Sequence, residues 1–370
     1  MFRNSRNHQE TIAEARAMAS NSTLPLTMRA AQWRTIKGGI DKNLTLATNA
    51  KLPKNSPSLP KGQTLVKVAY ASVNHLDYKI AEMPLTNFMF SKPVTPGLDF
   101  SGTIVSTTLD EFQSGQNVFG RTELPIGGTL AEYVVVRSKG LAVLPDGVEL
   151  RDAACVGICG TTALQCMLPF VKAGDKVFIN GGSGGVGVFA IQVAKALGCS
   201  QVTVTCSVSN AEFCRNLGAD ETIDYKSEDP IEVLKKKEDK FDFILDTVFN
   251  DPDLYWQSHQ YLKPEGQYVC VGLPPRFQTF KSLLTISLLP RWLGGGKRKF
   301  KYHSVTANRK DFGQIVDWMK DGKVKAVIEE EFGLEDSSKA YARLKEGRTT
   351  GKLVVRVGDE AGADDQGVVQ

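Results

Sequence analysis

The stretch Val177–Gly198, VFINGGSGGVGVFAIQVAKALG, constrains the fold of this chain more than any other feature. A short apolar run leads into a cluster of glycines and then into an apolar pattern with helical spacing, which predicts a strand, a tight turn and a helix. Two kinds of chemistry use such a turn: a dinucleotide site with the pattern G-x-G-x-x-G, and a serine nucleophile with the pattern G-x-S-x-G. Both patterns occur here, the first at Gly182, Gly184 and Gly187 and the second at Gly181, Ser183 and Gly185.

The pattern of apolar and turn-forming residues changes at about residue 150. From Met28 to about Arg137, strand-like runs such as TLVKVAYASV and DFSGTIVSTT stand between glycine and proline turns, which predicts a mostly antiparallel, barrel-like unit. From about Asp152 onward, strand-like and helix-like runs alternate, which predicts a parallel, doubly wound sheet with helices on both faces. A chain of 370 residues is long enough for two such units, each with its own core.

The surroundings of the glycine turn favour a dinucleotide site over a nucleophile. A serine nucleophile needs an acid and then a histidine further along the chain, and Asp246 followed by His303 has that order. However, the sequence has no HGG-type oxyanion loop, and a barrel-like unit stands where several sheet strands should precede the serine. Val177–Cys206 has the size of one βαβ unit, whose helix N-terminus presents N–H groups to phosphates. We therefore predict cofactor contacts from Gly182, Ser183, Gly184, Gly185, Val186 and Gly187.

The end of the second strand of this unit indicates which dinucleotide binds. An NAD site usually carries Asp or Glu about 20 residues after the motif, where it holds the ribose 2′-hydroxyl. Here the sequence is CSVSN, with no acid. Because a carboxylate would repel a 2′-phosphate, its absence favours NADP(H). The candidate donors to that phosphate are Ser207, Ser209, Asn210 and Tyr225; alternatively, these residues only cap the following helix.

Further motifs occur in an order typical of one superfamily. SVNHLDYKI, PGLDFSGTIV and GGTLAEYVVV precede the glycine turn, and NLGADETIDY, FDFILDTV and GKLVV follow it. Together they resemble the medium-chain dehydrogenase/reductase superfamily, and within it the zinc-independent quinone oxidoreductase and enone (enoyl) reductase branch. The resemblance implies an α/β fold with a GroES-like, mostly β barrel catalytic domain at residues 28–152 plus 307–357 and a Rossmann NADP-binding domain at residues 153–306. We expect residues 1–27 and 358–370 to be disordered tails.

The sequence departs from the zinc-containing members of this superfamily. Asn74 and Leu98 stand at two of their three catalytic ligand positions, and the third falls near Ile158, beside Cys159. A catalytic zinc needs three protein ligands, so we predict no metal. Without a Lewis acid, the hydride acceptor must itself be activated, as a C=C bond beside a carbonyl (enone, enal or enoyl) or a quinone is.

The resemblance also implies roles for single residues. Asn74 would lie at the nicotinamide ribose and the substrate, Thr162 and Lys352 near the cofactor, and Gly272 and Leu273 beside the nicotinamide. The titratable candidates for the proton donor are Tyr78 and His303, each of which alternatively has a structural role, with water as donor. The predicted function is an NADPH-dependent enone or quinone reductase. The alternatives are a zinc-type alcohol or aldehyde dehydrogenase and a non-catalytic NADPH-binding protein.

Net charge and cysteine content limit the kinds of partner and the compartment that we expect. The net charge is +4 and basic clusters are short, so we expect a small-molecule substrate and no nucleic acid. The apolar run Ser282–Pro290 is too short to span a bilayer. We expect this run and the basic residues that follow it to form a lid or a dimer contact, or alternatively a membrane-surface contact. The resemblance allows a homodimer or a monomer. Seven scattered cysteines predict a reducing compartment, the cytoplasm, with mitochondria as the alternative because of the N-terminal segment.

Overall fold

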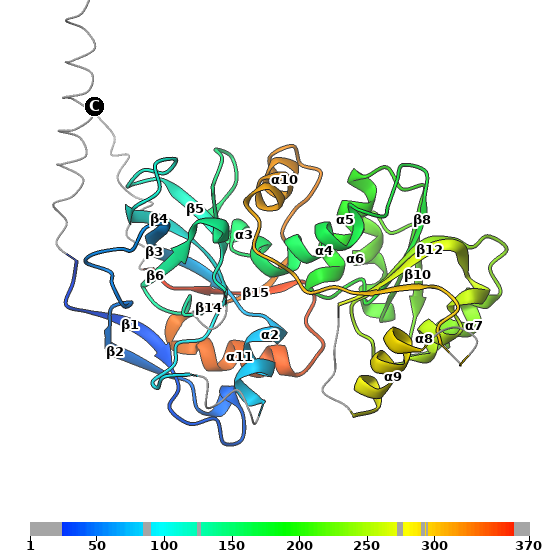
Figure 1. The fold of residues 1–370 in the computed structure, drawn as a ribbon, viewed down its shortest axis with the longest axis horizontal. Coiled ribbons are helices and arrows are strands. Elements are labelled where there is room, and N and C mark those ends of the chain that lie inside the picture. Colours follow the sequence, from blue (N-terminus) through cyan, green and yellow to red (C-terminus); the bar gives the residue numbers. More distant parts are fainter. Residues whose placement is uncertain are drawn as a thin grey trace, which may run out of the picture.

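The computed structural model describes residues 24–83, 90–123, 127–271, 277–289, 293 and 295–358. Apart from residues 24–27 and 358, the two predicted tails lie outside this range, as do Gly272 and Leu273. The described chain forms two lobes joined by a central layer that contains α3 (Leu150–Ala153), α4 (Thr161–Met167) and α10 (Arg309–Lys320) (Figure 1). None of the described helices is long and apolar enough to cross a membrane.

The first lobe is built on a seven-stranded sheet. Its strands are β3 (Gln63–Ser72), β4 (Asp99–Thr107), β5 (Asn117–Arg121), β6 (Tyr133–Arg137), β7 (Leu141–Val143), β14 (Ile328–Gly333) and β15 (Lys352–Arg356). The order is β14-β15-β3-β4-β5-β7, with β6 paired to β3, and every pair except β14–β15 is antiparallel. The hairpin of β1 (Thr27–Gln32) and β2 (Thr45–Lys51) and the helices α2 (His75–Glu82) and α11 (Ser337–Lys345) complete the lobe.

The second lobe contains the predicted parallel sheet. Its strands are β8 (Lys176–Asn180), β9 (Gln201–Cys206), β10 (Glu221–Asp224), β11 (Phe241–Asp246), β12 (Leu262–Cys270) and β13 (Lys299–Tyr302), and they are ordered β10-β9-β8-β11-β12-β13. All pairs are parallel, and the connections include α5 (Gly185–Ala196), α6 (Ala211–Asn216), α7 (Pro230–Lys235), α8 (Asp253–Trp256) and α9 (Phe277–Leu288). The prediction of an α/β, doubly wound sheet beside a mostly antiparallel one is confirmed.

The strand order places the glycine turn at a ligand-binding position. The chain runs from β8 outward to β9 and β10, then crosses back to β11 on the other side of β8. In open α/β sheets, ligands bind beyond the carboxyl ends of the strands where the strand order reverses. The turn that follows β8 lies at that switch point.

The central layer differs from the single helix that DAACVGICGTTALQCMLPF suggests. Over this stretch the layer consists of α3, a π-helical turn at Val156–Gly160, and α4. Gly157 permits this arrangement, because a Cβ there would lie 2.4 Å from Asp99 Oδ1 and 2.6 Å from the Gly120 carbonyl oxygen. The π-helical turn therefore packs directly on β4 and β5.

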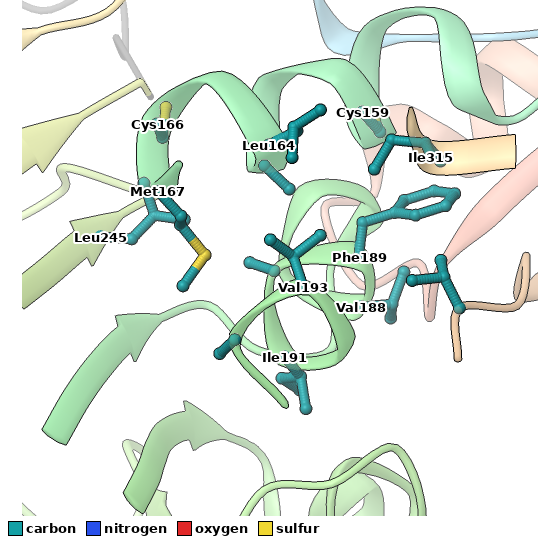
Figure 2. Close-up of a cluster of buried hydrophobic side chains, with 14 of the residues drawn as sticks. Cys159, Leu164, Cys166, Met167, Val188, Phe189, Ile191, Val193, Leu245 and Ile315 are labelled. Atoms are coloured by element: carbon teal, nitrogen blue, oxygen red, sulfur yellow. The ribbon is translucent and has the colours of Figure 1, made fainter. Parts of the chain in front are cut away.

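A large apolar core holds this layer against the second lobe. Leu164 and Met167 of α4 lie in one buried cluster with Phe189 and Val193 of α5, as Figure 2 shows. Ile315 of α10 joins the same cluster. The first lobe, the central layer and the Rossmann-like sheet thus share packing at their junction, which positions the two halves of the site described next.

Candidate functional site

The glycine turn is tightly packed on one side and open on the other. A Cβ on Gly187 would lie 2.1 Å from the Gly181 carbonyl oxygen, and one on Gly182 would lie 2.7 Å from Val204 Cβ. At Gly184 the only atom within 4 Å of an added Cβ is the Gly181 oxygen, at 3.7 Å. The first and third glycines of the motif are therefore required by packing, whereas the second leaves room for a ligand to approach the backbone.

A chain of hydrogen bonds supports this turn from below. The N–H of Gly181 donates to Thr205 Oγ1 (2.8 Å), whose hydroxyl donates to Asn180 Oδ1 (2.7 Å). Asn180 Nδ2 donates to Asp246 Oδ1 (2.9 Å), and the Tyr268 hydroxyl donates to Asp246 Oδ2 (2.6 Å). The chain crosses four neighbouring strands and fixes the turn without a ligand.

These features fit the diphosphate of a dinucleotide. Because the first N–H groups of a helix have no intrahelical partner, the start of α5 at Gly185 and Val186 offers donors to an anion. The turn also contacts the first lobe, since Gly351 N donates to the Ser183 carbonyl (2.8 Å). The dinucleotide turn and the end of the strand pair β14–β15 are therefore directly joined.

The residues predicted for the 2′-phosphate gather at the ends of β9 and β10. Ser207 Oγ and Ser209 Oγ are 2.9 Å apart, and Asn210 Nδ2 donates to Thr350 Oγ1 (3.2 Å). Tyr225 follows β10 and is 53% exposed.

Asp224, which the sequence analysis did not weigh, lies opposite Cys206 in the register of β9 and β10. Its carboxylate accepts hydrogen bonds from Lys226 N and Ser227 Oγ, which hold its pKa below the usual range. The acid is thus engaged in its own turn.

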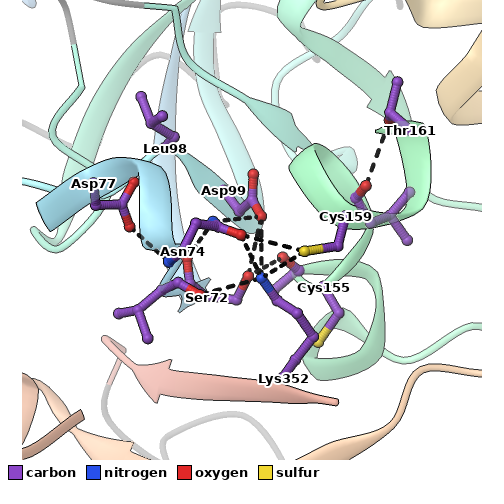
Figure 3. Close-up of polar contacts among 12 residues, drawn as sticks. Ser72, Asn74, Asp77, Leu98, Asp99, Cys155, Cys159, Thr161 and Lys352 are labelled. Atoms are coloured by element: carbon purple, nitrogen blue, oxygen red, sulfur yellow. Dashed lines mark hydrogen bonds and ion pairs between the residues drawn. The ribbon is translucent and has the colours of Figure 1, made fainter. Parts of the chain in front are cut away.

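A buried polar cluster lies on the first-lobe side of the site (Figure 3). Lys352 Nζ donates to Asn74 Oδ1 (2.6 Å) and to the Val73 carbonyl (3.2 Å), and it lies 3.5 Å from Cys159 Sγ and 3.7 Å from Asp99 Oδ2. Lys352 is 3% exposed and Asp99 is fully buried. Burial favours the neutral amine, but the neighbouring Asp99 carboxylate opposes it, and the pKa of Lys352 is raised. The site thus contains a buried ammonium group.

Asn74 is fully hydrogen-bonded within this cluster. Its Oδ1 accepts from Lys352 and from the Cys159 thiol (3.5 Å), and its Nδ2 donates to Asp99 Oδ2 (2.9 Å) and the Ser72 carbonyl (3.3 Å). A carboxamide offers two donors and two acceptor lone pairs, so all four are engaged. Asn74 also precedes α2, and its N–H donates to Asp77 Oδ2 (2.8 Å).

Asp77 is a strongly perturbed acid next to this cluster. Burial raises its pKa to about 7, against hydrogen bonds from the Asn74 N–H and the Tyr341 hydroxyl (3.1 Å). Its partner groups are the cap of α2 and a buried tyrosine of α11, so its main contacts are structural.

His303 lies at the carboxyl end of β13, on the other side of the site. Its Nε2 lies 3.1 Å from Gln165 Oε1. That oxygen also accepts from Thr306 N, while Gln165 Nε2 donates to the Thr306 carbonyl, so the amide orientation is fixed and His303 Nε2 carries the proton. Burial lowers the pKa of His303. Because the Nε2 proton is directed at Gln165, a proton for another group would have to come from Nδ1, which is an acceptor in the neutral imidazole.

The remaining predicted site residues have less specific surroundings. Tyr78 lies on α2, half-buried, with Lys345 Nζ 5.8 Å above its ring, and it packs against the core of the first lobe. Burial raises its pKa. Thr162 is buried in α4. Gly272 and Leu273 lie outside the described residues.

Within the described ranges, no three His, Cys, Asp or Glu side chains are grouped to hold a metal ion. Leu98 is buried, and the Lys352 ammonium lies among Asn74, Asp99 and Cys159. All seven cysteines are buried, and none of them forms a disulfide.

One charged residue of the site could not be predicted from the sequence. Arg121, the last residue of β5, is directly opposite Asp99 in the strand register and only 6% exposed. An arginine at the end of a short strand gives no signal in the sequence, because only the pairing of β4 and β5 brings it next to Asp99.

Comparisons with known proteins agree with this architecture. Residues 60–146 match the alcohol dehydrogenase GroES-like domain family, and residues 217–355 match the zinc-binding dehydrogenase family. The chain is 42% identical over 362 residues to a trans-enoyl reductase of Aspergillus terreus, covering 93% of this chain and 99% of the relative. It is 34% identical over 312 residues to a zinc-type alcohol dehydrogenase-like protein of Schizosaccharomyces pombe, covering 82% and 89%.

A solved quinone oxidoreductase from Coxiella burnetii has a similar fold. Its TM-score is 0.77 at 28% sequence identity, with 90% of this chain and 99% of that chain covered. The two lobes, the parallel sheet with its glycine turn and these relatives all indicate the same superfamily. The chain is an oxidoreductase that belongs to the medium-chain dehydrogenase/reductase superfamily, in its enoyl and quinone reductase branch.

Proposed function

We propose that this protein is an NADPH-dependent, zinc-independent reductase whose small-molecule acceptor is an activated C=C bond beside a carbonyl, or a quinone. The observation that carries the proposal is the contact between the dinucleotide turn and the buried cation. A Cβ on Gly185 would lie 3.3 Å from Lys352 Cδ and 3.1 Å from Cys159 Sγ. A ligand held by the start of α5 would therefore lie next to a buried ammonium group.

The acceptor class follows from the charges of this site. The nicotinamide cofactor supplies a hydride when it is bound. Addition at the β-carbon of an enone moves an electron pair onto the carbonyl oxygen, and a proton later returns to the α-carbon. A fixed cation in a region with little water stabilises that negative charge without reorganisation. Lys352 supplies such a cation, and the names of the enoyl reductase and quinone oxidoreductase relatives support this acceptor class.

Asn74 has a positioning role in this proposal. Its amide links Lys352 to Asp99 and keeps the ammonium group at a fixed place beside the turn. Asp99 balances the charge of Lys352, so that the buried cation does not depend on solvent. Proton return to the acceptor is assigned to water, because the unprotonated Nδ1 of His303 is an acceptor and Tyr78 packs into the first-lobe core.

The preference for NADPH rests on the end of β9. Two hydroxyls and an amide gather there at Ser207, Ser209 and Asn210, and Asp224 at the end of the adjoining β10 accepts hydrogen bonds from Lys226 N and Ser227 Oγ. Tyr225 is exposed at the adjoining strand end. The seven buried cysteines, none of which forms a disulfide, suit a reducing compartment, for which we propose the cytoplasm.

A turnover assay with a metal chelator tests this proposal. NADPH oxidation is followed with a panel of quinones, alkyl enones and 2-alkenals, and then with NADH in place of NADPH. We expect turnover that survives chelation and a higher kcat/KM with NADPH. Turnover that stops on chelation and returns with zinc would instead support an alcohol dehydrogenase. Tight NADPH binding without turnover of any acceptor would support a non-catalytic binding protein.

A further inference from the structure

Arg121 is buried at the junction of the two lobes. It pairs with Asp99 across β4 and β5, and directly opposite residues of an antiparallel pair have side chains on the same face with Cβ atoms about 5 Å apart. Arg121 therefore lies beside the cluster of Asp99, Asn74 and Lys352. On its other side, Arg121 Nη1 donates to the Val305 carbonyl (3.3 Å), two residues after His303.

Most of the hydrogen-bonding capacity of this guanidinium is unused. Of its five N–H donors, two have partners within the described part of the chain: Nε donates to the Thr122 carbonyl (3.3 Å) and Nη1 to Val305. Both bonds are long, and no carboxylate of the described residues forms an ion pair with it. Nη2 has no hydrogen-bond partner among the described residues, although Arg121 is only 6% exposed.

Burial of such a group is costly unless it is paired. Desolvation lowers the pKa of Arg121, and the charges of Asp99, Glu123 and Asp77 offset this only from a distance. An oxygen atom placed against Nη2 would satisfy the free donors, and a planar guanidinium binds oxygens through two parallel N–H groups. The arrangement is suited to an oxygen-bearing ligand at the junction of the lobes.

Asn74 and Lys352 have no comparable capacity to donate further hydrogen bonds. Asn74 uses all four of its hydrogen-bonding positions, and the Lys352 ammonium is surrounded by Asn74, Val73 and Cys159. We infer that Arg121 donates hydrogen bonds to the carbonyl or quinone oxygen of the hydride acceptor and stabilises the negative charge that develops there. This inference rests on the proposed function, and it makes Arg121 a catalytic residue.

Substitution of Arg121 tests this role. Arg121→Met removes the donors and keeps a long side chain, and Arg121→Lys keeps the charge. Removing a donor to a developing oxyanion typically costs about 100-fold to 1,000-fold in rate. We therefore expect kcat/KM for an alkyl enone to fall by about 100-fold or more in Arg121→Met and by less in Arg121→Lys. The dissociation constant of NADPH, measured by its fluorescence, stays unchanged.

A control substitution at a second arginine separates an effect on catalysis from an effect on the packing between parts of the fold. Arg309 of α10 joins the central layer to the first lobe through Glu111 (2.8 Å) and the Ser138 carbonyl (2.8 Å), and its side chain is 38% exposed. Arg309→Met should leave kcat/KM with the enone unchanged. In Arg121→Ala, low concentrations of guanidinium chloride should restore part of the enone turnover, whereas sodium chloride at equal ionic strength should not.

The outcomes distinguish the inference from the proposed function. If wild-type protein reduces the enone and folded Arg121→Met does so at the same rate, Arg121 is not the donor and the proposed function stands. Loss of NADPH binding in Arg121→Met, or absence of rescue by guanidinium in a folded Arg121→Ala, would also overturn the inference. If the wild-type protein reduces no enone or quinone, the proposed function itself fails.

Discussion

Alanine substitutions at two glycines of the turn should change ligand-free stability in opposite directions. Gly184 has φ −76° and ψ 172°, an extended conformation open to any residue, and an added Cβ meets only the Gly181 oxygen at 3.7 Å. At Gly187 the Cβ would lie 2.1 Å from the Gly181 oxygen and 2.6 Å from the Gly182 oxygen. Both variants should lose NADPH affinity, but for different reasons.

The magnitudes follow from these contacts. Gly184→Ala reduces the entropy of the unfolded chain and should stabilise the ligand-free protein by about 0.4–1 kcal/mol. Its methyl group occupies the space in which we place the pyrophosphate, so NADPH should bind at least about tenfold more weakly, or ~1.4 kcal/mol. In Gly187→Ala the turn must move by about 1 Å, at about 1–3 kcal/mol of strain. The helix propensity of alanine offsets about 1 kcal/mol, which leaves a net loss of up to about 2 kcal/mol.

Urea unfolding of the ligand-free variants and fluorescence titration with NADPH measure the two effects. Gly313→Ala in α10 is the control: its Cβ meets no atom within 4 Å, so it should gain about 1 kcal/mol of stability and bind NADPH like the wild type. The reasoning would be refuted if Gly184→Ala bound NADPH with wild-type affinity, because the open side of the turn would then not face the cofactor.

Three further substitutions test other parts of the site. Burial raises the pKa of Asp77 from about 3.9 to about 7, so the folded state holds a proton that the unfolded state loses. The free energy of unfolding of the wild type should therefore fall by up to about 4 kcal/mol as the pH rises from about 4 to 7. Asp77→Asn should lack this loss in urea unfolding at several pH values, and parallel pH curves would contradict it. Thr205→Val leaves the Gly181 N–H without its acceptor, which should lower the free energy of unfolding by about 1–3 kcal/mol and weaken NADPH binding. Unchanged NADPH binding would show that the hydrogen bonds below the turn do not position it. Lys352→Met leaves Asp99 without its cation and should cost about 3–5 kcal/mol, and in the folded fraction kcat with an enone should fall more than NADPH affinity. An equal fall of both would argue against a role for the ammonium group in turnover.

The turn and the two kinds of sheet were predictable because local spacing determines them. The apolar run before Gly181 and the helical pattern after Gly187 can form only one arrangement around such close backbone contacts. Alternation of strands and helices similarly predicts a parallel sheet. The π-helical turn at Val156–Gly160 was not predictable, because it depends on contacts with Asp99 and Gly120 in another lobe.

The polar network of the site depends on contacts between distant parts of the chain. Lys352 and Asn74 are 278 residues apart, and only the pairing of β15 with β3 brings them together. The sequence pointed to both residues through a family resemblance, but it did not show that every hydrogen-bonding position of Asn74 is used. Arg121 gave no signal at all, since its burial results from the packing of β5 against the segment that carries His303.

The most direct test of the account is the transfer of a labelled hydride. The wild-type protein is incubated with NADPH deuterated at the transferable position of the nicotinamide and with an alkyl enone, in the presence of a metal chelator, and the product is examined by mass spectrometry and NMR. We predict a saturated ketone with deuterium at the β-carbon and a solvent-derived proton at the α-carbon. An allylic alcohol labelled at the carbinol carbon, formed only when zinc is restored, would contradict it.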